Sequence, residues 1–321
     1  MSDPIRILAI RLGAMGDVIQ CLPAVASLKH GIPRSHVTWV IEKRWAPLLE
    51  QNPYVDRVVL LNRASVSGLC QSWRVLRAQP YDIAVDFQGL TKSALVGAAS
   101  RSERLFGYSR RIVREKIAAW FYSARVESSA VHRVDRYLDL AAAAGASPLL
   151  RSFPIPAGKP EGSLPQGPFV LASPGAGWAA KQWPLEYYSE LGRRLSVECG
   201  CTLVLNGSER ADVPHTHWHV SGLPGLIDAT RRAAAIVGLD SGPMHLAAAL
   251  GKSGVAIFGP TDPAQNGPCG GRITVLRSPR AVTTYKRNAP DTPMREVHPD
   301  AVFQALQPAL VEAGLPLSKP A

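Results

Sequence analysis

The feature that most constrains the fold of this chain is the alternation of short apolar runs with segments of helical periodicity. Apolar, β-branched runs typical of buried strands occupy Ile5–Arg11, Val37–Ile41, Arg57–Leu61 and Tyr81–Phe87. Between the first two runs, Asp17–Lys29 carries its apolar residues at helical spacing. Strands that alternate with helices in this way predict a parallel sheet with helices on both faces, and therefore an α/β fold.

A second stretch of the same kind follows a segment rich in proline and glycine. Residues 154–168 contain five prolines and three glycines, which is typical of a linker. After it, strands are predicted at Phe169–Ala172, Thr202–Leu205, Ala233–Leu239 and Val255–Phe258, and helices at Pro184–Val197, Met244–Leu250 and Pro299–Ala313. The pattern predicts two Rossmann-like domains, residues 1–155 and 156–321, facing each other across a cleft that holds the active site. Whether the last helix packs back on the first domain is left open.

The charge of the chain favours an anionic partner. It has 36 Lys and Arg against 25 Asp and Glu, a net charge of 36 − 25 = +11. Because the arginines are scattered, charge alone does not choose among nucleic acid, an acidic membrane surface and phosphorylated small molecules. The sequence has no uninterrupted apolar run of 18 residues, no leader pattern at its start and only five scattered cysteines. We therefore expect a cytosolic protein with reduced thiols.

The first candidate motif is Arg11-Leu-Gly-Ala-Met-Gly-Asp17, between the first strand and the first helix. Its glycines allow close approach of a ligand to the backbone, and the following helix N-terminus favours an anion. The spacing is not the full G-x-G-x-x-G pattern, so it gives little support for dinucleotide binding. Asp17 has two interpretations: an acid in the first helical turn that complements the helix dipole, or a general base directed into the cleft.

The second candidate is Ser173-Pro-Gly-Ala-Gly177, with Lys181 just beyond it. Small residues after a strand expose backbone N–H groups to a phosphate, and Lys181 adds a point charge. The alternative is an ordinary connecting loop with a solvated lysine.

The third candidate is Gly238-Leu-Asp-Ser-Gly-Pro-Met-His245. Asp240 ends an apolar strand and is suited to binding sugar hydroxyls, while the next helix N-terminus would face a pyrophosphate. The alternative is that Asp240 and Ser241 only cap this helix, and that His245 packs in the core.

Three alternating histidines, His215, His217 and His219, would share one face of a strand, as metal ligands do. No neighbouring cysteine or acid completes a ligand set, and the flanking residues indicate a loop. We expect no metal site here.

Three stretches together resemble a known family. Gly-Ala-Met-Gly-Asp-Val begins at Gly13, Asp-Ser-Gly-Pro-Met-His-Leu-Ala-Ala-Ala-Leu begins at Asp240, and Phe-Gly-Pro-Thr-Asp-Pro begins at Phe258. They are similar to the motifs of glycosyltransferase family 9, the lipopolysaccharide heptosyltransferases, in the same order and over most of the chain. Gln88-Gly-Leu-Thr-Lys-Ser93 and Thr261-Asp-Pro263 resemble heptosyltransferase I, which adds the first heptose to Kdo.

The resemblance implies a GT-B fold and an inverting mechanism without metal or other cofactor. The donor would be ADP-L-glycero-D-manno-heptose, and the acceptor an anionic Kdo–lipid A at the inner face of the inner membrane. The protein would then be cytoplasmic and peripherally attached to that membrane. Its oligomeric state is left open, with a monomer favoured.

The resemblance also assigns roles to residues. It makes Asp17 the catalytic base, and places Lys181 on the donor phosphates and Glu209 at the ribose. The implied donor-binding residues are Ser173, Lys181, Glu209, Asp240, Ser241, Gly242 and His245. The implied acceptor-side residues are Gly13, Met15, Gly16, Arg63, Gln88 and Arg114. The chain departs from the family at Trp178-Ala-Ala180, where hydroxyl residues often precede the lysine.

Several alternatives stay open. The same fold and site would suit heptosyltransferase II, another family 9 enzyme, or a nucleotide-sugar epimerase. A nonenzymatic regulator or nucleic-acid binder would use the positive charge, but no helix-turn-helix or aromatic-basic RNA motif is present, and we expect no nucleic-acid partner. A basic segment around Arg110–Lys116, close to Trp120-Phe-Tyr122, is either an approach surface for the acceptor or a solvated helix face.

Overall fold

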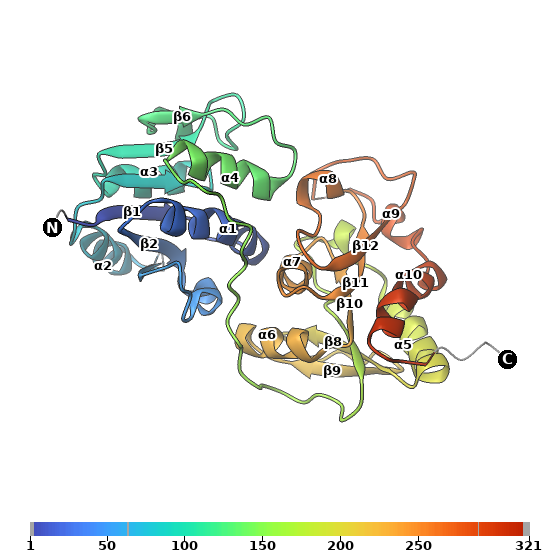
Figure 1. Ribbon diagram of the computed structural model, residues 1–321. Helices are drawn as coiled ribbons and strands as arrows, with labels where there is room; N and C mark the ends of the chain where they lie inside the picture. The colour runs from blue at the N-terminus through green and yellow to red at the C-terminus, as the bar shows by residue number, and fades with distance from the viewer. Residues whose placement is uncertain (1–2, 63, 288, 317–321) are drawn as a thin grey trace. The chain divides into compact units, whose positions relative to one another are not determined.

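The computed structural model describes residues 3–62, 64–287 and 289–316. The chain divides into two compact units, Met1–Pro156 and Ala157–Ala321 (Figure 1). Each unit contains one six-stranded sheet in which all neighbouring strands are parallel. We refer to them as the first unit and the second unit.

The sheet of the first unit has the strand order β3-β2-β1-β4-β5-β6. Its strands are β1 (Ile5–Ile10), β2 (Ser35–Glu42), β3 (Arg57–Leu61), β4 (Ile83–Asp86), β5 (Arg104–Tyr108) and β6 (Ala124–Val126). The helices are α1 (Met15–Gly31), α2 (Val66–Arg77), α3 (Thr91–Ala99) and α4 (Arg133–Ala143), with short 3₁₀ turns η1 (Lys43–Leu49) and η2 (Ala118–Trp120). Figure 1 shows α4 beside α1, and the two helices pack together.

The sheet of the second unit has the order β12-β11-β10-β7-β8-β9. Its strands are β7 (Phe169–Ala172), β8 (Thr202–Gly207), β9 (Thr216–Val220), β10 (Ala235–Leu239), β11 (Ser253–Phe258) and β12 (Arg272–Arg277). The helical segments are η3 (Ala179–Lys181), α5 (Leu185–Cys199), α6 (Leu223–Arg232), α7 (Gly242–Ala249), α8 (Pro263–Asn266), α9 (Thr292–Arg295) and α10 (Pro299–Glu312). The last helix, α10, packs on α5 and against β11 in the second unit.

The two sheets have the same topology. If β7 is matched with β1, the order in both is third, second, first, fourth, fifth and sixth strand, the order of a Rossmann fold. The chain reverses its direction across the sheet between the first and fourth strands, which are β1 and β4 in one unit and β7 and β10 in the other. Ligands of such sheets bind outside the carboxyl ends of the strands at this switch point.

Buried aromatic side chains anchor the core of each unit. Trp39 and Phe87 are almost fully buried in the first unit, and Trp183 and Phe303 in the second. Trp183 Nε1 donates a 2.7 Å hydrogen bond to the carbonyl oxygen of Val297, so this large ring is buried without leaving its N–H unsatisfied.

The sequence-based α/β prediction is confirmed, with one local error. Residues around His217 were expected to form a loop, but Thr216–Val220 is the edge strand β9. A polar, half-exposed edge strand lacks the apolar run that identifies a buried strand. Both His217 Nε2, at 2.9 Å, and His219 Nδ1, at 3.1 Å, lie within hydrogen-bonding distance of the carbonyl oxygen of Ser163.

Candidate active site

Four of the predicted site residues follow the strands at the two switch points. In the first unit, Asp17 follows β1 and Gln88 follows β4. In the second unit, Ser173 follows β7 and Asp240 follows β10. Because these strands are neighbours in their sheets, each pair of loops lies at one carboxyl edge. The strand order therefore gives each unit one candidate ligand-binding edge.

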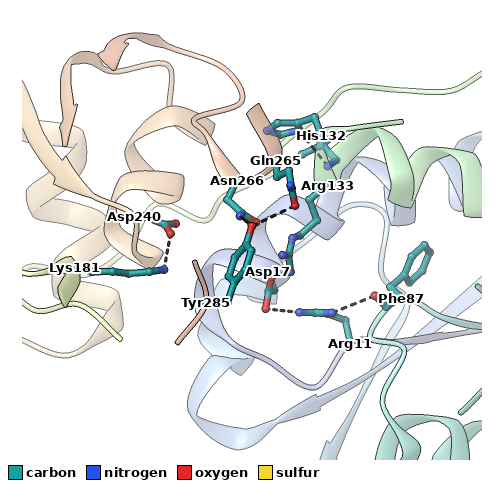
Figure 2. Close-up of polar contacts among 11 residues, drawn as sticks. Arg11, Asp17, Phe87, His132, Arg133, Lys181, Asp240, Gln265, Asn266 and Tyr285 are labelled. Carbon is teal, nitrogen blue, oxygen red and sulfur yellow. Dashed lines mark hydrogen bonds and ion pairs between the residues drawn. The ribbon is translucent and has the colours of Figure 1, made fainter. Parts of the chain in front are cut away.

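Asp17 in the first unit is held by two arginines, a group that we call the Asp17 cluster. Arg11, at the end of β1, forms an ion pair with Asp17 Oδ2, and its Nη1 donates a 3.1 Å hydrogen bond to the carbonyl oxygen of Phe87. Arg133, at the start of α4, donates from Nη1 to Asp17 Oδ1 at 2.8 Å. Figure 2 shows Arg11 between Asp17 and Phe87. The backbone after β4 therefore holds the guanidinium group of Arg11, and this group in turn holds the carboxylate of Asp17.

The negative charge of Asp17 and the positive charges of the two arginines stabilise one another. Burial acts to lower the pKa of Arg11, but Asp17 and Tyr137 raise it, and the net direction is upward. The pKa of Arg133 is also raised, because Tyr137 and Asp17 outweigh burial. Both guanidinium groups therefore stay charged and favour the ionised carboxylate of Asp17. The side chain of Asp17 remains 21% exposed, which leaves it accessible to a ligand.

The interpretation of Asp17 as a helix-dipole acid fits its place but not its contacts. It does lie in the first turn of α1. However, the hydrogen bond and ion pairs described above go to arginines from outside the helix, one of them 116 residues away in the chain. A carboxylate that only complements a helix dipole needs no such partners.

The neighbouring residues that are predicted to lie on the acceptor side mainly shape the loop. At Gly13 an added Cβ would lie 2.6 Å from Trp45 Nε1, so glycine is needed for the approach of the indole ring. Met15 and Gly16 are buried in the first turn of α1. Gln88 is buried, and its Oε1 accepts a 2.9 Å hydrogen bond from the backbone N–H of Leu12. Gln88 thus joins the loop after β4 to the loop that carries Asp17.

Asp86 holds the backbone of Gln88 in place. The carboxylate of Asp86 is fully buried and accepts hydrogen bonds from Tyr122 Oη at 2.7 Å, Ser93 Oγ at 2.8 Å and the Gln88 backbone N–H at 2.9 Å. Burial raises the pKa of Asp86 against the opposing effect of these donors.

Two further predicted acceptor residues add little to the description of the site. Arg114 is exposed in the segment after β5, and Arg63 lies outside the described residues.

In the second unit, Lys181, Asp240 and Thr261 form the Lys181 cluster. Lys181 Nζ forms an ion pair with Asp240 Oδ2, and Thr261 Oγ1 donates to the same oxygen at 2.6 Å. The side chains of Lys181 and Asp240 are 11% and 9% exposed. Lys181 Nζ also lies 4.0 Å from the centre of the Trp178 ring, a cation–π contact. Trp178 thus supports the lysine at the place where the chain departs from the family pattern.

The helix N-terminus next to Asp240 is not capped by a side chain. Ser241 is the N-cap residue of α7, yet its side chain makes no capping hydrogen bond. Among the described residues, no hydrogen-bond partner is found for its buried Oγ. The interpretation of Ser241 as a simple cap is therefore wrong, and the first N–H groups of α7, beginning at Gly242, are available to an anion.

The other predicted donor residues differ in burial and in position. His245 is buried in the first turn of α7. Ser173 is buried and lines a small cavity with Gly238 and Met244. Glu209 is exposed in the loop after β8. Within the described ranges, no group of three or more His, Cys, Asp and Glu side chains is placed to hold a metal ion.

Sequence reasoning gave no role to Arg11, Arg133 or Thr261. A charged residue at the end of the apolar run Ile5–Arg11 was a usable signal for Arg11. Arg133 has no local signal, and Thr261 lies in a family motif that does not show its partner, because each meets its carboxylate only through the fold. Figure 2 also shows Tyr285, whose Oη donates to Gln265 Oε1 at 3.2 Å, as a further polar group of the second unit.

Comparison with known proteins identifies the family. Residues 69–293, more than two thirds of the chain, match the family model "Glycosyltransferase family 9 (heptosyltransferase)". The chain belongs to glycosyltransferase family 9. It is therefore a sugar-transferring enzyme.

Two relatives and one solved structure illustrate the similarity. Lipopolysaccharide heptosyltransferase 1 of Pseudomonas aeruginosa is 30% identical over 290 residues, which cover 83% of this chain and 81% of that protein. The Escherichia coli protein of the same name is 27% identical over 309 residues, covering 86% and 94%. The structure of "E. coli heptosyltransferase WaaC with ADP" has a TM-score of 0.75 at 23% identity and covers 95% of this chain and 99% of that chain. The predicted GT-B fold of two Rossmann-like domains is thereby confirmed.

Proposed function

We propose that this family 9 enzyme transfers L-glycero-D-manno-heptose from an ADP-heptose donor to Kdo of the lipid A inner core. The first unit would bind the acceptor and the second unit the donor. The observation that carries the proposal is the Asp17 cluster, an accessible carboxylate held by Arg11 and Arg133 at the switch point of the first sheet. A fixed carboxylate of this kind is suited to accept a proton from a sugar hydroxyl.

The Lys181 cluster supports donor binding in the second unit. An ammonium group beside an open helix N-terminus is suited to a pyrophosphate. Asp240 would bind hydroxyls of the sugar, and Glu209 those of the ribose. The similar structure "E. coli heptosyltransferase WaaC with ADP-2-deoxy-2-fluoro heptose" agrees with this choice of donor for the present chain.

The proposed reaction is a single displacement. Asp17 takes the proton from the acceptor hydroxyl as that oxygen forms a bond to the anomeric carbon of the heptose. The bond from the anomeric carbon to the β-phosphate oxygen breaks on the opposite face, and ADP leaves with the electron pair. The configuration at the anomeric carbon is therefore inverted. Lys181 and the N–H groups of α7 would stabilise the charge on the leaving phosphate, so the proposed mechanism requires no metal ion.

The proposal of the first heptose addition rests on the relatives named heptosyltransferase 1, of which the Pseudomonas aeruginosa protein is 30% identical over 83% of the chain. The Salmonella typhimurium heptosyltransferase 2 is 26% identical over 97% of the chain, so the second addition is kept as the alternative. The proposal places the enzyme in the cytoplasm, at the inner face of the inner membrane where the lipid acceptor is presented. Among the described residues, no helix is long and apolar enough to cross a membrane.

A transfer assay tests the proposal. ADP-heptose is incubated with Kdo–lipid A, with an acceptor that already carries one heptose, or with no acceptor, each with and without EDTA. We expect one heptose to be added to Kdo–lipid A, with EDTA having no effect. Transfer only to the heptosylated acceptor would instead assign the second addition. Conversion of the donor without acceptor would indicate an epimerase.

A further inference from the structure

One face of the first unit exposes an unusual set of large apolar side chains. They are Val66, Leu69 and Trp73 on α2, Leu95 on α3, and Ile117 and Trp120 at η2. We call these six residues and the elements that carry them the α2–α3–η2 face. Val66 is 79% exposed and Trp120 is 71% exposed, values far above those expected for core-forming residues.

The strand order puts these elements on the same side of the sheet. The connections β3–α2–β4, β4–α3–β5 and β5–η2–β6 all run toward β6, whereas β1–α1–β2 runs the other way. Because such crossovers are right-handed, α2, α3 and η2 lie on the face opposite α1. Two contacts join them: Arg77 Nε donates a 2.9 Å hydrogen bond to the carbonyl oxygen of Ala99 at the end of α3, and η2 packs on α3.

The exposed face of α2 has the pattern of a binding helix. Its inner face buries Gly68, Ser72 and Leu76. Val66, Leu69 and Trp73, at spacings of three and four residues, line its outer side. The unit covers the inner side of α2 and leaves these three large apolar side chains exposed.

Helix α2 and the segment that leads from β5 to η2 are also basic. Exposed arginines and lysines accompany the apolar residues: Arg74, Arg77, Arg110, Arg111, Arg114 and Lys116. The acidic residue among them, Glu115, accepts hydrogen bonds of 2.7 Å from the Thr91 backbone N–H and from Thr91 Oγ1. Exposed tryptophans and aliphatic residues surrounded by positive charge are the pattern of a protein surface that enters the headgroup region of an anionic bilayer.

We infer that the α2–α3–η2 face docks the first unit on an anionic lipid bilayer. The choice of a bilayer as partner rests on the proposed function, in which the acceptor is a membrane lipid. A second copy of this chain is disfavoured as partner, because a symmetric contact would place the same positive charges against one another. The N-terminal ends of α2 and α3 follow the carboxyl ends of β3 and β4, at the sheet edge that carries Asp17. Docking by this face therefore leaves the edge with the proposed base uncovered, so that an acceptor extending from the bilayer is able to reach it.

Vesicle co-sedimentation of the full chain tests the inference. The vesicles are phosphatidylethanolamine with phosphatidylglycerol, or phosphatidylcholine alone. The apolar variant is Ile117→Ser/Trp120→Ser, and the charge variant is Arg110→Glu/Arg111→Glu. The matched control is Val197→Ser, on α5 of the second unit, where the side chain is 69% exposed. We expect the wild type to bind the anionic vesicles only. The apolar variant should weaken this binding at least tenfold, and the charge variant should weaken it at least about fivefold for each reversed charge. The control should bind like the wild type.

Activity separates this inference from the proposed function. The apolar variant should keep wild-type turnover on a water-soluble Kdo saccharide and lose it on Kdo–lipid A embedded in vesicles. Equal vesicle binding by wild type and both variants would overturn the docking inference, even if heptose transfer is found. Vesicle binding that depends on these residues, without any heptose transfer, would overturn the proposed function and leave the docking inference standing. A dimer that dissociates in the apolar variant, with no vesicle binding, would identify a second copy as the occupant.

Discussion

Each unit holds one aspartate beside a positive charge at its switch point, but in different ways. Asp17 has a guanidinium on each carboxylate oxygen, from Arg11 and Arg133. Asp240 has a lysine and a threonine hydroxyl on the same oxygen. Arg11 is almost fully buried and is itself held by the backbone of Phe87. The ammonium group of Lys181, in contrast, lies at the end of a flexible side chain and contacts the ring of Trp178.

This difference suits two different tasks. Planar guanidinium groups, one of which is itself held by a backbone carbonyl, define a single position for a carboxylate. A proton acceptor requires such a fixed position. A lysine ammonium group is a movable point charge, so it is able to exchange its partner when a phosphate arrives. We therefore propose that the first cluster positions Asp17 and that the second is rearranged when the donor binds.

The replacement Asp17→Asn should have the largest effect. The amide keeps the shape of the side chain but does not accept the proton, so we expect kcat to fall by roughly 10²- to 10⁴-fold, with a smaller change in the KM of the donor. Steady-state kinetics measures both values. Asp135→Asn is the matched control, because Asp135 is also an acid in the first turn of a helix, α4. Near-normal turnover of Asp17→Asn would reduce Asp17 to a helix-dipole acid.

The replacement Lys181→Ala should mainly affect donor binding. Loss of a charge-assisted hydrogen bond to phosphate is expected to raise the KM or the dissociation constant of ADP-heptose by roughly 10- to 100-fold. Isothermal titration with ADP measures this directly. Lys29→Ala removes a comparable lysine–aspartate pair, with Asp56 in the first unit, and should leave ADP binding unchanged. If Lys181→Ala affects only kcat, the second cluster acts in the chemical step and the contrast between the units disappears.

Thr261→Val should have a smaller effect, because Thr261 acts through Asp240. Loss of its hydrogen bond to the carboxylate is expected to weaken donor binding by roughly fivefold, about 1 kcal/mol. Thr261→Ser restores the hydroxyl and should restore the wild-type KM. A serine variant as defective as the valine variant would show that the hydroxyl alone does not maintain donor binding and that packing around residue 261 contributes.

We expect Asp86 to affect mainly the pH dependence of the free energy of unfolding. Because burial raises the pKa of Asp86 in the folded chain, the unfolded chain loses this proton first as pH rises. The stability of the wild type relative to Asp86→Asn should therefore fall as pH rises from about 4, the ordinary value for aspartate, through the raised pKa. Urea unfolding at a series of pH values measures the difference.

Asp56 supplies a control of opposite sign. Burial acts to raise the pKa of Asp56, but hydrogen bonds from Lys29 and the Val37 backbone outweigh it, and the pKa is lowered. Its stabilisation is present above the ordinary aspartate pKa and is lost as pH falls, so the stability of the wild type relative to Asp56→Asn should rise with pH. Parallel slopes for the two variants would contradict the assigned pKa directions.

Much of the fold was predictable because its signals are local. The run Ile5–Arg11 and the periodic segment Asp17–Lys29 identified β1 and α1 within a few residues. The strand β9 was missed because an edge strand does not need the apolar residues of a buried one. The candidate residues Asp17, Lys181 and Asp240 were predicted because each lies in a segment that follows a recognisable strand.

The sequence by itself determined the two α/β halves, the loops that carry the candidate chemistry and the family. These follow from periodicity and short motifs, which are properties of neighbouring residues. Only the tertiary structure decided that Arg133 reaches Asp17, that Thr261 reaches Asp240, and that α2, α3 and η2 expose one basic and apolar face. Such contacts join residues far apart in the chain. They arise from strand order and the handedness of the connections, which no local pattern specifies.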